Sequence, residues 1–193
     1  MIVHGLVGDL VLPDDPAGLV VFAHGSGSSR RSPRNRAVAG TLNAAGFGTL
    51  LLDLLTEDED ERRFDIPLLA GRLEAVVDEM AEHDLPMGLF GASTGATAAL
   101  IAAARRNTVR AVVSRGGRPD LAAGDLAKVR APTLLVVGGL DTPVIELNRR
   151  AAALITTARI EVVPGADHLF SQPGTLEQVA RLATAWFGEH LRG

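Results

Sequence analysis

Short apolar runs alternate with longer amphipathic stretches along the whole chain. Residues 18–23 and 132–137 are nearly all apolar, which is typical of strands buried on both faces of a parallel sheet. In residues 66–83 the apolar side chains recur every three or four positions, which is typical of a helix with one buried face. The same two patterns predict further strands over 6–12, 47–52, 85–90, 109–114 and 159–163, and further helices over 33–45, 96–106, 125–129, 143–154 and 174–190.

Strands that alternate with helices of this length indicate a three-layer α/β sandwich, in which a mainly parallel sheet is flanked by helices. No repeat or low-complexity linker interrupts the series, so we expect a single domain over residues 1–193. The acidic run at 57–61 lies between two elements and predicts a solvated loop over 54–65. Because ligands of such sheets bind at the carboxyl ends of the strands, the chemistry is expected in the residues that follow each strand.

Composition excludes several classes of function. The chain is 47% hydrophobic and 22% charged, as in an ordinary globular protein, and its net charge of −4 argues against general nucleic-acid binding. The absence of cysteine excludes disulfides, zinc–thiolate sites and a cysteine nucleophile. The start of the chain lacks the basic and apolar pattern of a signal peptide, and the apolar runs are too short to span a bilayer, so we expect a cytoplasmic protein without membrane contact.

The segment Gly91-Ala92-Ser93-Thr94-Gly95 fits the pattern G-x-S-x-G between an expected strand and an expected helix. In that context the turn is a nucleophile elbow, which exposes the serine hydroxyl above the sheet edge. Ser93 is therefore the candidate nucleophile. The alternative is a Gly/Ser turn in which Ser93 only caps the helix.

A serine hydroxyl needs a base to accept its proton, and the base needs a carboxylate to orient it. His168 lies in the loop after the last expected strand, whereas His4, His83 and His190 fall at a strand start, a helix end and the tail. Asp141 follows the apolar strand 132–137 and completes the order Ser, Asp, His that the α/β-hydrolase template requires. Asp53 and Asp167 are the competing acids, but Asp53 could instead cap a loop, and Asp167 should point away from its neighbour His168.

Acyl transfer also needs donors that stabilise an oxyanion. The N–H of Thr94, directly after the candidate nucleophile, is one expected donor. The second is expected from the Gly/Ser-rich loop that begins at His24, with the N–H of Ser26 favoured and Gly25 and Gly27 as alternatives. His24 is expected to shape this loop beside the substrate rather than to act as the base. The sequence contains neither of the glycine-rich nucleotide-binding motifs, so nucleotide binding is not expected, and no residue is assigned to a metal.

Two groups of arginines follow strand ends in this acidic chain. They are Arg30, Arg31, Arg34 and Arg36 after the Gly/Ser loop, and Arg115 and Arg118 after the strand 109–114. One interpretation is that one or more of them, Arg30 and Arg115 first, bind a carboxylate or phosphate of the substrate. The alternative is a solvated rim that pairs with the acidic run at 57–61.

These motifs resemble the α/β-hydrolase superfamily over essentially the whole chain, and most closely its small dienelactone-hydrolase-related branch. The resemblance implies a cofactor-independent esterase with Ser93, Asp141 and His168 as nucleophile, acid and base. Dienelactone hydrolases proper use a cysteine nucleophile, so the serine here favours a carboxylic-ester or lactone hydrolase of the serine type. Residues 115–131 leave no room for the helical lid that many α/β-hydrolases insert there, which favours an open site and short acyl groups.

The expected partner is a small ester substrate, anionic if the arginines bind it, and an exposed edge strand could pair two copies of the chain into a homodimer. A thioesterase, acyltransferase or small peptidase would use the same three residues. A non-catalytic binding module on the same fold is a further alternative, although such a module would have no need of all three groups.

Overall fold

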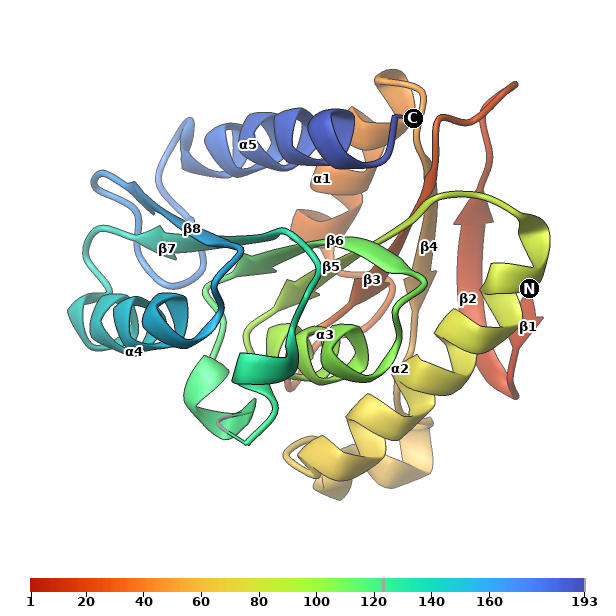
Figure 1. Cartoon of the computed structure of the whole chain (residues 1–193), viewed down its shortest axis with the longest axis horizontal. Helices are drawn as coiled ribbons and strands as arrows, with labels where there is room; N and C mark the ends of the chain where they lie inside the picture. Colours follow the sequence, from red (N-terminus) through yellow and green to blue (C-terminus); the bar gives the residue numbers. More distant parts are fainter. Residues whose placement is uncertain (123, 193) are drawn as a thin grey trace.

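A computed structural model describes residues 1–122 and 124–192 of the chain (Figure 1). The strands are β1 (Ile2–Val3), β2 (Leu6–Val11), β3 (Leu19–Ala23), β4 (Gly48–Leu52), β5 (Met87–Ala92), β6 (Val109–Arg115), β7 (Thr133–Gly138) and β8 (Ala158–Val163). The α-helices are α1 (Pro33–Ala44), α2 (Ile66–Met80), α3 (Thr94–Arg105), α4 (Thr142–Leu154) and α5 (Thr175–His190). Short 3₁₀ helices are η1 (Glu57–Arg62), η2 (Ala81–His83), η3 (Pro119–Ala122) and η4 (Leu126–Lys128).

The strands form one sheet in the order β1-β2-β4-β3-β5-β6-β7-β8. The pairs from β4 through β8 are parallel, whereas β2 runs antiparallel to β4 and β1 antiparallel to β2. Helices α1 and α5 cover one face of the sheet, and α2, α3 and α4 cover the other (Figure 1). The predicted three-layer α/β architecture is therefore confirmed. The carboxyl ends of the parallel strands all meet at one edge of this sheet.

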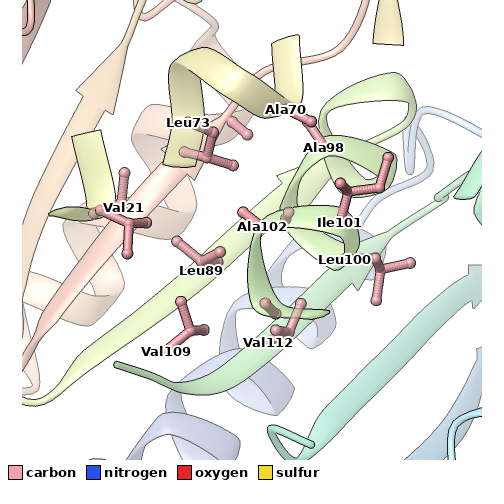
Figure 2. Packing of buried hydrophobic residues seen from close by; sticks show 14 of the residues in the cluster. Val21, Ala70, Leu73, Leu89, Ala98, Leu100, Ile101, Ala102, Val109 and Val112 are labelled. Atoms are coloured by element: carbon pink, nitrogen blue, oxygen red, sulfur yellow. The ribbon is translucent and has the colours of Figure 1, made fainter. Parts of the chain in front are cut away.

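The sheet buries an apolar cluster on each face. On one face, Val21, Leu89 and Val112 from the strands pack against Leu73 of α2 and Leu100 of α3, as Figure 2 shows. On the other face, the strands pack against α1 and α5 through a second cluster that includes Phe22, Phe90 and Phe187. Because the central strands are covered on both sides, they read as continuous apolar runs rather than alternating ones. No helix within the described residues is long and apolar enough to cross a membrane.

The acidic segment differs from the solvated loop that its charge run predicts, because it forms η1. Glu59 Oε2 accepts hydrogen bonds from the N–H and the hydroxyl of Thr56, which closes a capping box at the start of the turn. Arg72 of α2 donates to both carboxylate oxygens of Glu59 at 2.7 and 2.8 Å. Strand β1 and helix η3 are also absent from the sequence prediction, since each is too short to leave a periodic signal.

Candidate active site

Three of the predicted functional residues lie at the carboxyl edge of the sheet. Ser93 directly follows β5, Asp141 follows β7 after one glycine and one leucine, and His168 lies in the loop between β8 and α5. These strands are close in the sheet, with β6 alone between β5 and β7. The parallel arrangement therefore gathers three residues that are far apart in sequence.

Ser93 sits in a strained turn between β5 and α3. Its φ of 51° and ψ of −118° lie outside the regions that ordinary residues favour. The turn is tight, because a Cβ atom on Gly91 would lie 2.6 Å from the nitrogen of Ala96, and one on Gly95 would lie 2.6 Å from the carbonyl carbon of Ala23. Only glycine fits at these two positions, which is the physical reason for the G-x-S-x-G spacing.

Asp141 and His168 form a direct pair. Asp141 Oδ2 lies 2.6 Å from His168 Nδ1, with 15% of the aspartate side chain and 39% of the histidine side chain exposed. Gly138 allows the two loops to meet, because a Cβ atom at that position would lie 2.9 Å from the carbonyl carbon of Asp167. This contact leaves Nε2 of His168 as the ring nitrogen that can serve another group.

Ser93 and His168 are brought to the same short segment at the end of β6. The N–H of Ser93 donates to the carbonyl oxygen of Arg115 at 3.1 Å. The next residue, Gly116, lies against the imidazole, since a Cβ atom there would be 3.4 Å from Cε1 of His168. No hydrogen bond joins the hydroxyl of Ser93 to the imidazole in this conformation, although such bonds often form only when substrate binds. The sequence reasoning missed this role of residues 115–116.

The competing acids are engaged elsewhere. Asp53 accepts a hydrogen bond from the N–H of Arg30 at 2.6 Å and forms an ion pair with the guanidinium of the same residue. Asp167 turns away from its neighbour His168 and caps its own loop, accepting from the N–H groups of Leu169 and Ser171 at 3.0 and 2.9 Å. The hydrogen bond from Ser171 holds the pKa of Asp167 below its ordinary value.

The loop after β3 contacts the nucleophile turn, but with a different geometry from the predicted one. The N–H of Ser26 donates to Thr94 Oγ1 at 2.9 Å, so in this structure it is not free for an oxyanion. The N–H of Thr94 belongs to the first residue of α3, where a helix offers no acceptor. Gly25 packs against the turn, because a Cβ atom there would lie 3.1 Å from Cβ of Ser93.

His24 is a structural residue of this loop, as expected, and its ring has no nitrogen left for substrate. Its Nε2 accepts from the N–H of Leu54 at 3.1 Å, and its Nδ1 lies 2.9 Å from the carbonyl oxygen of Gly25. The buried imidazole thereby ties the end of β3 to the segment that follows β4. His24 therefore lines the cavity and shapes the loop beside it, but its two ring nitrogens are engaged within the protein.

A cavity of about 200 Å³ opens beside Thr94 on the α2 side of the sheet. One wall is the loop from His24 to Arg31, including Gly25, Ser26 and Gly27, and the other comes from residues 53–63 and Leu69 of α2. The segment that contains η1 therefore bounds this cavity. Between β6 and β7, where the sequence predicts no helical lid, the described residues contain the two short helices η3 and η4. Sequence reasoning missed this wall because it read the acidic run only as solvated.

The arginines divide into paired and unpaired groups. Arg30 forms ion pairs with Asp53 and Asp9, which raise its pKa, so the prediction that it binds a substrate anion is wrong for this conformation. Arg36 pairs with Asp9 and Arg118 with Asp120, whereas Glu59 and Asp60 of the acidic run pair with Arg62, Arg72 and Arg63. Arg115 is buried and has no carboxylate within 4 Å among the described residues.

Within residues 1–122 and 124–192, no three histidine, aspartate or glutamate side chains are grouped closely enough to hold a metal ion.

Comparison with known proteins places this site in a family context. A model of the alpha/beta hydrolase domain matches residues 16–184. The crystal structure of a dienelactone hydrolase from Anabaena variabilis is 54% identical, with a TM-score of 0.94 over 97% of this chain and 93% of that one. Est1E from Butyrivibrio proteoclasticus, solved with ferulic acid, shares the fold at 18% identity, with a TM-score of 0.86 over 98% of both chains.

Two curated proteins from strains of Mycobacterium tuberculosis are 60% identical over 197 residues, and each is named "Putative phosphoribosyl transferase". The match covers 97% of this chain but only 44% of each of those proteins. This name therefore belongs to proteins that are more than twice as long as the matched region.

Proposed function

The chain belongs to the alpha/beta hydrolase family and is related to dienelactone hydrolase, and we propose that it is a serine hydrolase that cleaves small carboxylic esters or lactones. The observation that carries the proposal is the 2.6 Å contact between Asp141 and His168 at the sheet edge that also presents the strained Ser93. Fold alone would not carry it, because one fold hosts many functions.

The proposed reaction proceeds through an acyl-enzyme. His168 Nε2 accepts the proton of the Ser93 hydroxyl as Ser93 Oγ attacks the carbonyl carbon of the substrate. Asp141 holds the imidazole through Nδ1 and stabilises the imidazolium that forms. His168 then gives the proton to the leaving alcohol, and a water molecule attacks the acyl-enzyme with His168 again as the base.

The negative charge of the tetrahedral intermediate falls on the carbonyl oxygen of the substrate. The N–H of Thr94 at the start of α3 is the proposed first donor to that oxygen, where the helix dipole adds positive potential. The hydroxyl of Thr94, which accepts the N–H of Ser26, still has its own proton to donate. The second donor is therefore proposed to be the Thr94 hydroxyl, oriented by the N–H of Ser26, and each oxyanion donor contributes on the order of 3 kcal/mol in comparable sites.

The names of the relatives bear on the substrate. The dienelactone hydrolase from Anabaena variabilis supports a lactone or ester, since its sequence and structure match nearly the whole chain. The transferase name of the mycobacterial proteins is proposed to refer to the part of those proteins that this chain does not match. We propose that the chain acts without a cofactor and on a small molecule in the cytoplasm.

The proposal is tested with a fluorophosphonate probe, which reacts only with an activated serine. We expect one adduct per chain, mapped to the peptide that contains Ser93, and none in Ser93→Ala or His168→Ala. Ser28→Ala, on the loop that lines the cavity, is the matched control and should label fully. A folded protein without an adduct would contradict the proposal. If Ser93 is labelled, the rates of hydrolysis of an ester, a thioester and an amide of the same acyl group show which leaving group the enzyme prefers.

A further inference from the structure

The guanidinium of Arg115 is a buried cation without a counter-ion. Only 7% of the residue is exposed, and Nε is fully buried without any hydrogen-bond partner. Its one hydrogen bond within the described part of the chain is a long contact of 3.4 Å from Nη2 to Asn35 Oδ1. Burying a charge without an ionic partner is costly, so this arrangement needs a compensating group.

The surroundings of Arg115 add positive potential rather than neutralising it. Asn35 lies in the first turn of α1, whose N-terminus carries a partial positive charge, and that turn contains no acidic residue. Arg34 belongs to the same turn and forms no ion pair with the described residues. Burial and the cation of Arg34 lower the pKa of Arg115 to about 10.

Aromatic contact does not supply the missing charge. The guanidinium carbon of Arg115 lies 5.8 Å from the centre of the Phe170 ring, and a contact of this kind stabilises a cation only modestly. Phe170 itself is two residues from His168, so this contact places the loop that carries the candidate base against the arginine. The cation is thus enclosed by α1, β6 and the His168 loop.

The backbone of Arg115 contacts the candidate nucleophile directly. Arg115 is paired in register with Ala92, and its carbonyl oxygen accepts the N–H of Ser93. The guanidinium extends to the α1 side of the sheet, whereas the cavity beside Thr94 lies on the α2 side with Leu69. The arginine and the cavity therefore lie on opposite sides of the sheet edge that carries Ser93.

From this geometry we propose that Arg115, Arg34 and the N-terminus of α1 bind a phosphate monoester group of the ester substrate. The proposal rests on the serine hydrolase function proposed above and names its substrate class. Two guanidinium groups and a helix N-terminus, without a carboxylate, match a dianion better than a singly charged carboxylate. Hydrolysis would release a carboxylic acid and a phosphorylated alcohol, and the phosphate group itself would not react.

Three acetate esters test the proposal directly. They are 1-acetylglycerol, 3-acetoxypropanoate and 1-acetylglycerol 3-phosphate, which carry no charge, a carboxylate and a phosphate. We expect kcat/KM to be at least about tenfold higher for the phosphate ester than for the other two, equivalent to about 1.4 kcal/mol of transition-state binding. The phosphate assignment would be overturned if kcat/KM were equally high for the carboxylate ester and the phosphate ester, or the same for all three esters.

Variants assign the preference to the cluster. Arg34→Met should raise KM for the phosphate ester by about tenfold and leave the hydrolysis of 1-acetylglycerol unchanged. Arg115→Met should lower kcat/KM for the phosphate ester by about tenfold relative to its own kcat/KM for 1-acetylglycerol. Arg110→Met is the matched control, because Arg110 is an exposed arginine of the same strand. If Arg115→Met does not fold, Arg34→Met on the half-buried residue decides the question. Retention of the phosphate preference in the folded Arg34 and Arg115 variants would overturn the proposal.

Calorimetry with inorganic phosphate separates this proposal from the hydrolase function. If no ester is cleaved but phosphate still binds to the wild-type protein, and binding is lost in Arg115→Met, the anion site stands and the proposed reaction fails. If esters are cleaved but phosphate neither binds nor inhibits the cleavage of 1-acetylglycerol, the anion site fails and the reaction stands. Chloride at equal ionic strength controls for screening.

Discussion

The backbone N–H of Ser26 donates a hydrogen bond to Thr94 Oγ1 at 2.9 Å, which ties the loop after β3 to the first residue of α3. The hydroxyl of Thr94 therefore sets the distance between the two segments that are proposed to hold the oxyanion. Thr94 directly follows the candidate nucleophile in the chain, so a substitution at Thr94 is expected to shift the position of Ser93.

Thr94→Val removes this hydroxyl and keeps the shape of the side chain. We expect kcat to fall by about tenfold, because the loop is no longer held against the turn and one oxyanion donor is lost or displaced. Thr94→Ser keeps the hydroxyl and should retain kcat within about threefold. Steady-state kinetics on a short ester measure both variants. Equal activity of Thr94→Val and the wild-type protein would show that the hydroxyl has no catalytic role.

Asp141→Asn tests which acid serves His168. The amide can donate where the carboxylate accepts, so the imidazole is held in the wrong tautomer and kcat should fall by about 10³-fold to 10⁴-fold. Asp167→Asn keeps an acceptor oxygen for the N–H groups of its loop and should retain kcat within about threefold. The assignment of Asp141 is wrong if Asp167→Asn loses as much activity as Asp141→Asn.

Gly95→Ala tests the packing of the nucleophile turn. The added Cβ would press on the backbone of Ala23 and His24, so we expect a loss of more than about 3 kcal/mol in the free energy of unfolding, or no soluble protein. Gly40→Ala is the control, because Gly40 lies in α1 with open space around the new Cβ, and it should stabilise the protein by about 0.5–1 kcal/mol. Denaturant titration gives both values.

The pair between Glu59 and Arg72 predicts a pH-dependent contribution to stability. The hydrogen bonds from Arg72 and Thr56 lower the pKa of Glu59 from 4.5 to about 2. Because this folded-state pKa lies below the unfolded one, the stabilisation is complete above pH 4.5 and is lost as the pH falls toward 2. Glu59→Gln should therefore lower the melting temperature at pH 7, by a difference that narrows between pH 4.5 and 2.

Glu61→Gln is the matched control for this prediction, since Glu61 is an exposed residue of the same short helix. It should leave the melting temperature nearly unchanged at both ends of the pH range. A Glu59→Gln protein that is destabilised equally at pH 7 and at low pH would show that the lost contact is not ionic.

The residues that carry the candidate chemistry were predictable because each follows a strand. Ser93, Asp141 and His168 occur in the chain order of the α/β-hydrolase template, and each follows a predicted strand. Because the carboxyl ends of parallel strands meet at one edge of the sheet, these positions predict that the three residues lie near one another. The distances between them were not predictable, because they depend on glycines such as Gly138 and Gly116 whose only sequence signature is their small size. Side-chain bonds to backbone, such as that of His24 to Leu54, are likewise invisible in the sequence.

The arginines show where sequence reasoning reaches its limit. Arg30 and Arg115 both follow strand ends, and both were predicted to bind a substrate anion. The sheet brings Asp53 and Asp9 to Arg30 through strand pairing over long sequence distances, whereas it brings no acid to Arg115. Tertiary structure thus decides that Arg30 is paired and Arg115 is not. No local sequence pattern distinguishes these two arginines.

The positive φ of Ser93 has an evolutionary consequence. A serine held in this conformation costs on the order of 1–3 kcal/mol, whereas glycine adopts it freely. A mutation to glycine at this one position would therefore relieve backbone strain and remove the hydroxyl at the same time. Lineages under selection for folding alone would drift toward glycine here, so a serine retained at this position across related chains would be a record of continued selection for turnover.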